Sequence, residues 1–267
     1  MDWLKLIDTS RVLVFSLVMA RVSGIVIMTP VFGAADIPVR FRALLAFSLA
    51  LLVMPSQWNV QVNEPQSLPM YIVVLAAETM IGLSIGVGLY IFFMGLEVAG
   101  EIMGHLGGLN VAQFFDPRSG ENLPLLSRLL HTLGLVAFVS CGGVQLTMMG
   151  LLDTFQTIPP GGGTIPVHVA DALLVILSLS FNLAFRVAAP VMVGVLISML
   201  VIGLLGRTLP QLNLMSIGFG VNTIVAFTIL YLSVGSVIWC FQERLVDVID
   251  LVLQGLHTPL SAGWLPP

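Results

Sequence analysis

Long apolar segments, separated by short connections rich in proline, glycine or charge, make up most of this chain. A helix needs about 20 residues to cross the hydrocarbon core of a bilayer, and a run of 18 or more apolar residues therefore predicts a transmembrane helix. The apolar segments that we expect to be helical are residues 12–32, 43–54, 70–98, 125–152, 172–206 and 214–241. This pattern predicts an all-α integral membrane protein with five or six membrane helices.

Two of these segments have unusual lengths. Segment 43–54 has only about a dozen residues, which is marginal for a membrane span. Segment 172–206 contains Pro190 and, at 1.5 Å per residue, would be about 52 Å long, whereas the hydrocarbon core is about 30 Å thick. We therefore expect this helix either to be steeply tilted and kinked or to extend out of the bilayer as part of a larger assembly.

The composition supports a membrane protein and narrows the possible functions. The mean hydropathy is +1.04 and only 9% of the residues are charged, whereas soluble domains carry about 25% charged residues. The net charge of −4 is scattered along the chain, so we expect no nucleic-acid-binding surface. Cys141 and Cys240 each lie in an apolar segment without a second cysteine or a histidine at metal-ligand spacing. We expect both to be small buried side chains, and we expect no metal and no cofactor.

Five charged residues lie in or beside the apolar segments: Arg21, Glu78, Glu97, Glu101 and Arg186. A charge at the centre of a membrane helix costs about 2.5–3.5 kcal/mol on insertion scales, so such residues normally face protein or water. Two interpretations stay open: a polar pathway or intersubunit contact, and a set of structural ion pairs inside the bundle. Glu97 and Glu101 share a helix face, but no histidine, serine or metal motif converges on them, so we do not expect an enzyme.

The connection 100–124 is the most distinctive part of the chain. It is punctuated by glycines and by Pro117, yet it is too apolar to be left in water. Non-helical backbone at membrane depth is tolerated only where protein buries it or where it lines a cavity. We therefore favour a re-entrant or plug-like loop over a loop exposed to solvent.

This loop and three other stretches carry a resemblance to a known family. The four stretches are Ala20-Arg21-Val22-Ser23-Gly24 with Pro30-Val31-Phe32-Gly33, Ile37-Pro38, Arg40 to Arg42 and Pro55; the loop 100–117; Asp153-Thr154-Phe155 with Pro159; and Ala184-Phe185-Arg186 with Ala189-Pro190, Arg207, Pro210-Gln211-Leu212-Asn213 and Gly218-Phe219. No single motif is decisive. Together and in this order, they resemble the family of the flagellar biosynthetic protein FliR and its injectisome counterparts in type III secretion.

The resemblance implies an architecture and a set of partners. Residues 1–171 would form a FliP-like helical region that includes the loop 100–124, residues 172–241 a FliQ-like long helical hairpin, and residues 242–267 a C-terminal amphipathic tail. The protein would join FliP and FliQ homologues, together with FlhB and FlhA homologues, in a helical hetero-oligomer. That assembly would lie in the bacterial inner membrane within the flagellar basal body, with part of it projecting toward the periplasm.

The resemblance also implies a function without catalysis. The chain would form and plug the channel through which unfolded substrates are exported. The loop residues expected to close the channel are Gly104, Gly107, Gly108, Leu109, Ala112, Phe114, Phe115, Asp116 and Pro117. The polar residues expected to support assembly are Arg21, Glu78, Glu97, Glu101, Arg186, Arg207, Gln211 and Asn213.

The chain departs from the family pattern at three positions, and one rival function stays open. Leu106 stands where relatives commonly carry glutamine, and Gly220 and Asn222 stand where they carry proline and a lysine-like residue. The rival is a stand-alone secondary transporter that couples an ion or a solute through intramembrane carboxylates and an arginine. Its expected coupling residues are Glu78, Glu97 and Arg186.

Overall fold

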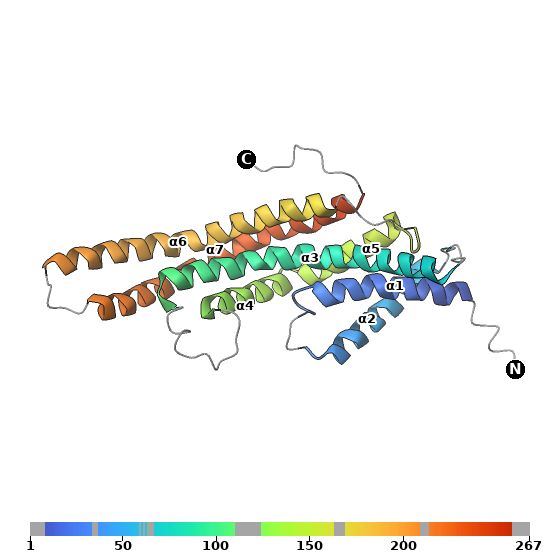
Figure 1. Cartoon of the computed structure of the whole chain (residues 1–267), viewed down its shortest axis with the longest axis horizontal. Helices are drawn as coiled ribbons and strands as arrows, with labels where there is room; N and C mark the ends of the chain where they lie inside the picture. Colours follow the sequence, from blue (N-terminus) through green and yellow to red (C-terminus); the bar gives the residue numbers. More distant parts are fainter. Residues whose placement is uncertain are drawn as a thin grey trace. The chain divides into compact units, whose positions relative to one another are not determined.

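The computed structural model describes residues 9–33, 37–58, 60, 62, 67–109, 124–162, 169–208 and 214–257 (Figure 1). These residues form helices and their connections, with no strand among them. The helices are α1 (Thr9–Met28), α2 (Val39–Val53), the 3-10 helix η2 (Met54–Gln57), α3 (Leu68–Leu106), α4 (Leu125–Ser140), α5 (Gly143–Thr157), α6 (Val169–Thr208) and α7 (Leu214–His257). By length and composition, five helical stretches can cross a membrane, or six if α4 and α5 count as one broken span. The prediction of an all-α membrane protein is confirmed.

Several helices are longer than the hydrophobic pattern predicts. α2 continues into η2, which gives a helical stretch of 19 residues over Val39–Gln57, so the short segment 43–54 belongs to an element long enough to span. α3 has 39 residues and continues through Gly104, so the loop expected over residues 100–124 begins only after Leu106. α7 continues past residue 241 as far as His257. In each case the helix includes polar or glycine positions that interrupt an apolar run without ending a helix.

The pattern predicts one helix over residues 125–152, and this prediction is wrong. α4 ends at Ser140 and α5 begins at Gly143. Between them Gly142 has a φ of +78°, a left-handed conformation that glycine adopts without the steric cost of a Cβ atom. The break is invisible in the hydropathy because a Cys-Gly-Gly sequence does not interrupt an apolar run.

The helices pack into two compact units, each of which is described by itself below. Unit 1 comprises Met1–Ile91, Gly142–Leu177 and Val246–Pro267, and unit 2 comprises Phe92–Cys141 and Ser178–Leu245. Unit 1 therefore holds α1, α2, α5 and the first part of α3. It also holds the beginning of α6, up to Leu177, and the end of α7, from Val246. Unit 2 holds α4, the last part of α3 and most of α6 and α7.

In unit 1, α1 packs against the first part of α3 through glycines on both helices. A Cβ atom on Gly24 of α1 would lie 2.6 Å from the carbonyl oxygen of Thr79, and one on Gly86 of α3 would lie 2.6 Å from Cβ of Met28. A Cβ atom on Gly82 would collide with the carbonyl oxygen of Arg21. Small residues at four-residue spacing let membrane helices approach this closely, and the approach brings Arg21 next to α3.

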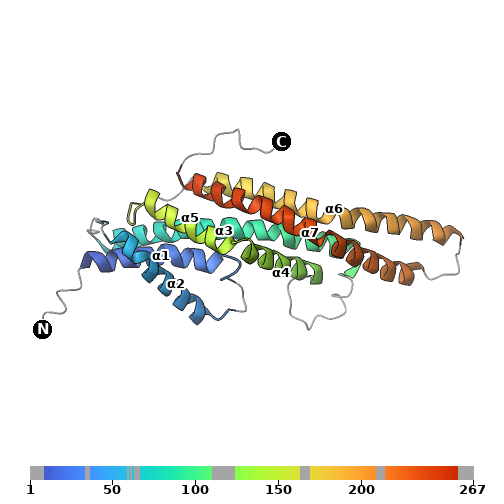
Figure 2. The same ribbon diagram turned by 180° about the vertical axis from the view of Figure 1, so that it is seen from behind.

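In unit 2, the parts of α6 and α7 that belong to this unit, residues 178–208 and 214–245, form an antiparallel hairpin and run side by side in both views (Figures 1 and 2). α6 has 40 residues and α7 has 44, which corresponds to about 60 Å and 66 Å at 1.5 Å per residue. Gly194 of α6 leaves room for the side chain of Ile229, and the Ser198 hydroxyl donates a 2.8 Å hydrogen bond to Oδ1 of Asn222. The expectation of a helix longer than the bilayer core is therefore met by α6.

Unit 2 also contains an aromatic core between α3, α4 and α7. The ring centroids of Phe92 and Phe93 lie 5.0 Å and 5.2 Å from that of Phe241, and Phe93 lies 5.7 Å from Phe138. All four side chains are almost completely buried. Tilted and edge-on pairs at these distances contribute beyond the area that they bury, so this cluster fixes the last part of α3 to α4 and α7.

Candidate functional site

The side chains of Arg21 and Glu78 form an ion pair in unit 1 that has no exposed surface. Nε of Arg21 donates a 2.7 Å hydrogen bond to Oε2 of Glu78, and Nη2 lies 2.7 Å from the same oxygen. The ring of Phe155 lies under the guanidinium, 4.3 Å from its carbon to the ring centroid. At this distance the attraction between the two charges offsets part of the free energy that it costs to remove each of them from water. A single charge buried in the same place would have no such compensation.

The same two side chains also bind the end of α5 and the turn after it. Nη1 of Arg21 donates to the carbonyl oxygens of Thr154 and Ile158 at 2.9 Å and 3.0 Å. The last carbonyl groups of a helix lack partners within the helix, and a cation near them is favourable. Oε1 of Glu78 accepts a 2.9 Å hydrogen bond from the backbone N–H of Gly161. The geometry therefore favours the structural interpretation of these two charges over a polar pathway.

Gly161 is required in this turn for two independent reasons. Its φ is +81°, in the region that favours glycine, and a Cβ atom there would lie 2.8 Å from a methyl group of Val62. The preceding Pro159 accepts a 3.0 Å hydrogen bond from the N–H of Gly162. The proline–glycine sequence that predicts a loop here thus also places the backbone N–H of Gly161 within hydrogen-bond distance of Glu78.

In unit 2, Glu97 of α3 pairs with His131 of α4. Oε1 of Glu97 lies 2.8 Å from Nδ1 of His131, and the two side chains are 19% and 24% exposed. The hydroxyl of Ser127, one turn before His131, donates a 2.8 Å hydrogen bond to the backbone carbonyl of Glu97. The sequence alone does not reveal this pair, because nothing in it relates two residues that are more than 30 positions apart.

The remaining charged candidates lie at the surface of the chain. Oε1 of Glu101 lies 3.7 Å from Nε2 of His105 one turn later on α3, and both side chains are more than half exposed. Arg186 and Arg207 are exposed on α6, and among the described residues neither forms a hydrogen bond or an ion pair. Arg186 thus has no polar partner among the described residues, and its expected contact with a partner protein stays a prediction. Gln211 and Asn213 lie outside the described residues.

The structure describes only the first part of the loop that was expected to close a channel. Gly104 is buried within α3, and Gly107, Gly108 and Leu109 follow the helix end. Gly108 has a φ of +77°, as is common where a helix ends. The residues of that loop that lie outside the described part are Ala112, Phe114, Phe115, Asp116 and Pro117.

The three positions where the sequence was expected to depart from the family pattern all lie among the described residues. Asn222 accepts the hydrogen bond of Ser198 and so joins α7 to α6. Gly220 is exposed, and a Cβ atom there would meet nothing within 4 Å. Leu106 is half-buried at the end of α3. The Asn222 position is therefore used within the chain, whereas Gly220 is sterically unconstrained by the described residues.

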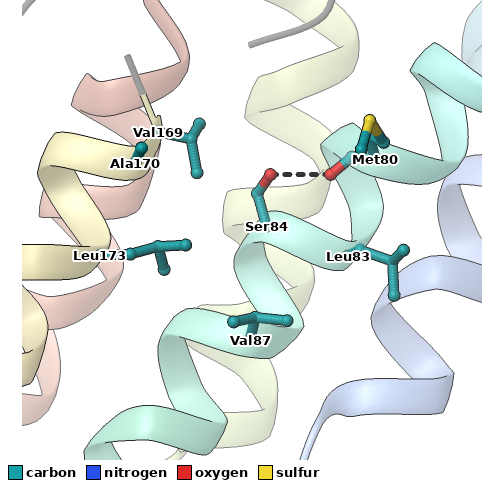
Figure 3. A pocket seen from close by; sticks show the side chains of 7 residues that line it. All are labelled: Met80, Leu83, Ser84, Val87, Val169, Ala170 and Leu173. Atoms are coloured by element: carbon teal, nitrogen blue, oxygen red, sulfur yellow. Dashed lines mark hydrogen bonds between the residues drawn. The ribbon is translucent and has the colours of Figure 1, made fainter. Parts of the chain in front are cut away.

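A cavity of about 240 Å³ lies in unit 1 between α3 and the beginning of α6 (Figure 3). Its lining side chains are Met80, Leu83, Ser84, Val87, Val169, Ala170 and Leu173. Among these described lining residues, Ser84 alone has a side-chain hydroxyl, and this hydroxyl donates a 2.7 Å hydrogen bond to the carbonyl oxygen of Met80. The described lining is therefore mainly apolar and contains no acidic or basic side chain.

The two cysteines are not buried as expected. Cys141 and Cys240 are free thiols with partial exposure. The run of apolar residues around each cysteine predicts a helix but does not tell which side of it faces the core. Among the described residues, no group of three histidine, cysteine or carboxylate side chains is arranged to hold a metal ion.

The chain is similar to known proteins over most of its length. The family model described as Bacterial export proteins, family 1, matches residues 12–248. The flagellar biosynthetic protein FliR of Escherichia coli (strain K12) is 30% identical over 211 residues, 79% of this chain and 80% of the relative. FliR of Caulobacter vibrioides is 30% identical over 242 residues, 90% and 96% of the two chains. FliR of Bacillus subtilis (strain 168) is 27% identical over 223 residues, 81% and 84% of the two chains.

Proposed function

This chain belongs to family 1 of the bacterial export proteins, and from that premise we propose that it is a subunit of the flagellar type III protein export apparatus. The observation that carries the proposal is the extent of the match, which includes nearly all of the seven α-helices from α1 to α7. Relatives named flagellar biosynthetic protein FliR match 79% to 90% of the chain. The alternative of a stand-alone transporter has no support from these matches.

The surroundings of the intramembrane charges also favour a subunit of an export apparatus over a stand-alone transporter. Glu78 is fully buried and already accepts hydrogen bonds from Arg21 and Gly161. Glu97 already pairs with His131. A coupling carboxylate must be reachable by its ion or solute, and the pairing and burial of Glu78 leave no room for one. The protein has a structural role in a channel and performs no chemistry of its own.

Partners cover the exposed faces of α6 and α7 in this proposal. Both helices expose large apolar side chains, among them Phe185, Leu200, Tyr231 and Trp239. Lipid can cover apolar side chains, but Arg186, the exposed neighbour of Phe185 in α6, would be costly to bury in lipid. Helices of FliP- and FliQ-type subunits, and subunits of the FlhB and FlhA type, supply the covering protein surface. In this arrangement residues 1–171 are the FliP-like region and residues 172–241 the FliQ-like hairpin.

The assembly lies in the bacterial inner membrane, in the flagellar basal body, and part of it projects toward the periplasm. The lengths of α6 and α7, 40 and 44 residues, support the projection because both helices are about twice as long as a bilayer core requires. The connection between α3 and α4, residues 107–124, closes the channel. Unfolded export substrates pass when that connection moves.

Two experiments test this function. Native mass spectrometry of the chain, purified from its own host in mild detergent, should find one copy bound to several small hydrophobic proteins; a folded monomer or homodimer would contradict the subunit role. Deletion of residues 107–114 should then make the host membrane permeable to small ions and molecules. A membrane that stays tight, with the assembly intact, would contradict the closing role of the loop but not the subunit role.

A further inference from the structure

One side of α6 is exposed along most of the part of this helix that belongs to unit 2. Exposed residues follow one another there at spacings of three or four, which places them on the same side of the helix. These residues form the α6 stripe: Asn182, Arg186, Pro190, Val193, Ile197 and Leu200. We propose that the α6 stripe is the docking face for a membrane helix of another subunit, and that this helix carries a carboxylate that pairs with Arg186. The existence of other subunits rests on the proposed function.

The two sides of α6 differ in burial over this length. Val187, Val191 and Val195, on the side opposite the stripe, are at most 2% exposed. On the stripe, the three apolar side chains after Pro190 are 56% to 64% exposed. The stripe is about 27 Å long from residue 182 to residue 200. One side of α6 thus packs within the chain, and the other presents a surface as long as a single membrane helix.

The beginning of the stripe is polar. Asn182 and Arg186 are exposed, and neither side chain forms a hydrogen bond or an ion pair with the described residues. Pro190 lies inside the helix and has no N–H, so the backbone carbonyl of Arg186, four residues earlier, lacks its helical donor. One turn of α6 therefore presents a cation, an amide and a carbonyl group. A carboxylate matches the guanidinium best, because the two groups can form a pair of parallel hydrogen bonds.

Lipid alone does not cover the surroundings of Arg186. A bilayer core centred on this residue would contain its charge, at a cost of about 2.5–3.5 kcal/mol on insertion scales. A bilayer with its headgroups at Arg186 and Arg207, which lie about 32 Å apart along the helix, would avoid this cost. It would, however, leave Phe181 and Phe185 outside its core, although they are 49% and 57% exposed. A protein helix that is apolar along the stripe and carries one carboxylate satisfies both the charge and the apolar side chains.

Photo-crosslinking in the host membrane tests what covers the stripe. A benzophenone-bearing residue replaces Leu200 on the stripe or, as the matched control, Met199, which is also exposed but points to another side of α6. The Leu200 position should give an adduct with a membrane helix of another subunit. That helix should carry an aspartate or a glutamate about four turns from the crosslinked residue, since Arg186 lies that far from Leu200. Adducts with lipid alone, or equal yields of the same peptide from both positions, would overturn the docking face.

Exchange of the two charges tests the pairing. Arg186→Glu should reduce the amount of co-purified partner about 10-fold or more, because it places two carboxylates together, and Arg186→Lys should reduce it less. Arg40→Glu, at an exposed arginine of α2, should leave it unchanged. Replacement of the partner's carboxylate by arginine should restore recovery with Arg186→Glu. Unchanged recovery with Arg186→Glu, or no restoration by the exchange, would overturn the pairing while the complex of the unaltered chain stays intact. An unaltered chain that purifies as a folded monomer would overturn the proposed function and the docking face with it.

Discussion

The carboxylate of Glu78 and the guanidinium of Arg21 form an ion pair without exposed side-chain surface. The guanidinium also donates to the carbonyl oxygen of Thr154 near the end of α5, and the carboxylate accepts a hydrogen bond from Gly161 in the turn that follows. The pair therefore connects three parts of unit 1: α1, α3 and the end of α5. Its position depends on Gly82, whose missing side chain lets the backbone of Arg21 approach α3. A charge that is costly in lipid is tolerated here because it meets a counter-charge and backbone acceptors inside the protein.

Removal of one charge of this pair should destabilise the protein strongly. Glu78→Ala leaves the guanidinium of Arg21 buried without a counter-charge, and Arg21→Ala leaves the carboxylate in the same state. Loss of one partner of a buried ion pair typically costs about 3–5 kcal/mol. Thermal unfolding of the purified protein in detergent should show a large decrease in melting temperature for either single variant.

A double variant separates the charge from the packing. Arg21→Met combined with Glu78→Leu leaves no buried charge and keeps much of the volume, so its melting temperature should lie above those of both single variants. Glu101→Gln is the control, because Glu101 is exposed and its contact with His105 is 3.7 Å long; exposed pairs contribute little. A double variant that is less stable than both single variants would contradict this account.

The sequence predicts the helical class and the unusual features of the long helices, because both depend on local hydropathy and helix length. It also indicates which charges need an explanation, since Arg21 and Glu78 stand out in apolar runs. The family resemblance adds the expected partners and function, which none of these local signals supplies.

The pairing of distant groups cannot be predicted in this way. Glu97 meets His131 only because α4 packs on α3, and the contacts of Thr223 with Gly107 depend on where α7 lies. The end of α3 at Leu106, rather than near Gly100, has a similar cause. A Cβ atom on Gly100 would collide with the backbone of Ser127, so this glycine is required for packing and not for a turn. Glycine spacing alone does not distinguish the two roles.

The close approach of α1 and α3 predicts opposite effects for two glycine substitutions. Gly82→Ala would place a methyl group on the carbonyl oxygen of Arg21, and backbone there cannot move easily because Arg21 is fixed by four hydrogen-bond acceptors. Gly203→Ala in α6 would meet nothing within 4 Å and should stabilise the helix by about 0.5–1 kcal/mol. Melting temperatures of the isolated chain in detergent should therefore fall for Gly82→Ala and rise slightly for Gly203→Ala. Equal effects at the two positions would contradict the packing described for α1 and α3.

The contact between Glu97 and His131 should be measurable as a coupling energy. A double-mutant cycle with Glu97→Gln and His131→Gln isolates the pairwise contribution, because each single variant removes the contact between carboxylate and imidazole and keeps a polar side chain. We expect a coupling of about 1 kcal/mol in the free energy of unfolding, in the range found for residues in direct contact. A cycle that closes to within experimental error of zero would show that the 2.8 Å contact does not stabilise the packing of α4 on α3.

Arg186 should contribute to assembly and not to the stability of the chain. Within the described residues it has no hydrogen-bond or ion-pair partner and it is exposed beside Phe185 on α6, so Arg186→Leu should leave the melting temperature of the isolated chain nearly unchanged. In the host, smaller amounts of the partner subunits should co-purify with the same variant. A partner group that accepts a hydrogen bond from the guanidinium would lose this contact and remain unpaired. Arg40→Leu, at another exposed arginine in the first turn of α2, is the comparison for a general effect of losing a surface charge. Undiminished recovery of partners with Arg186→Leu would mean that this cation faces water or lipid headgroups in the assembly and does not contact protein.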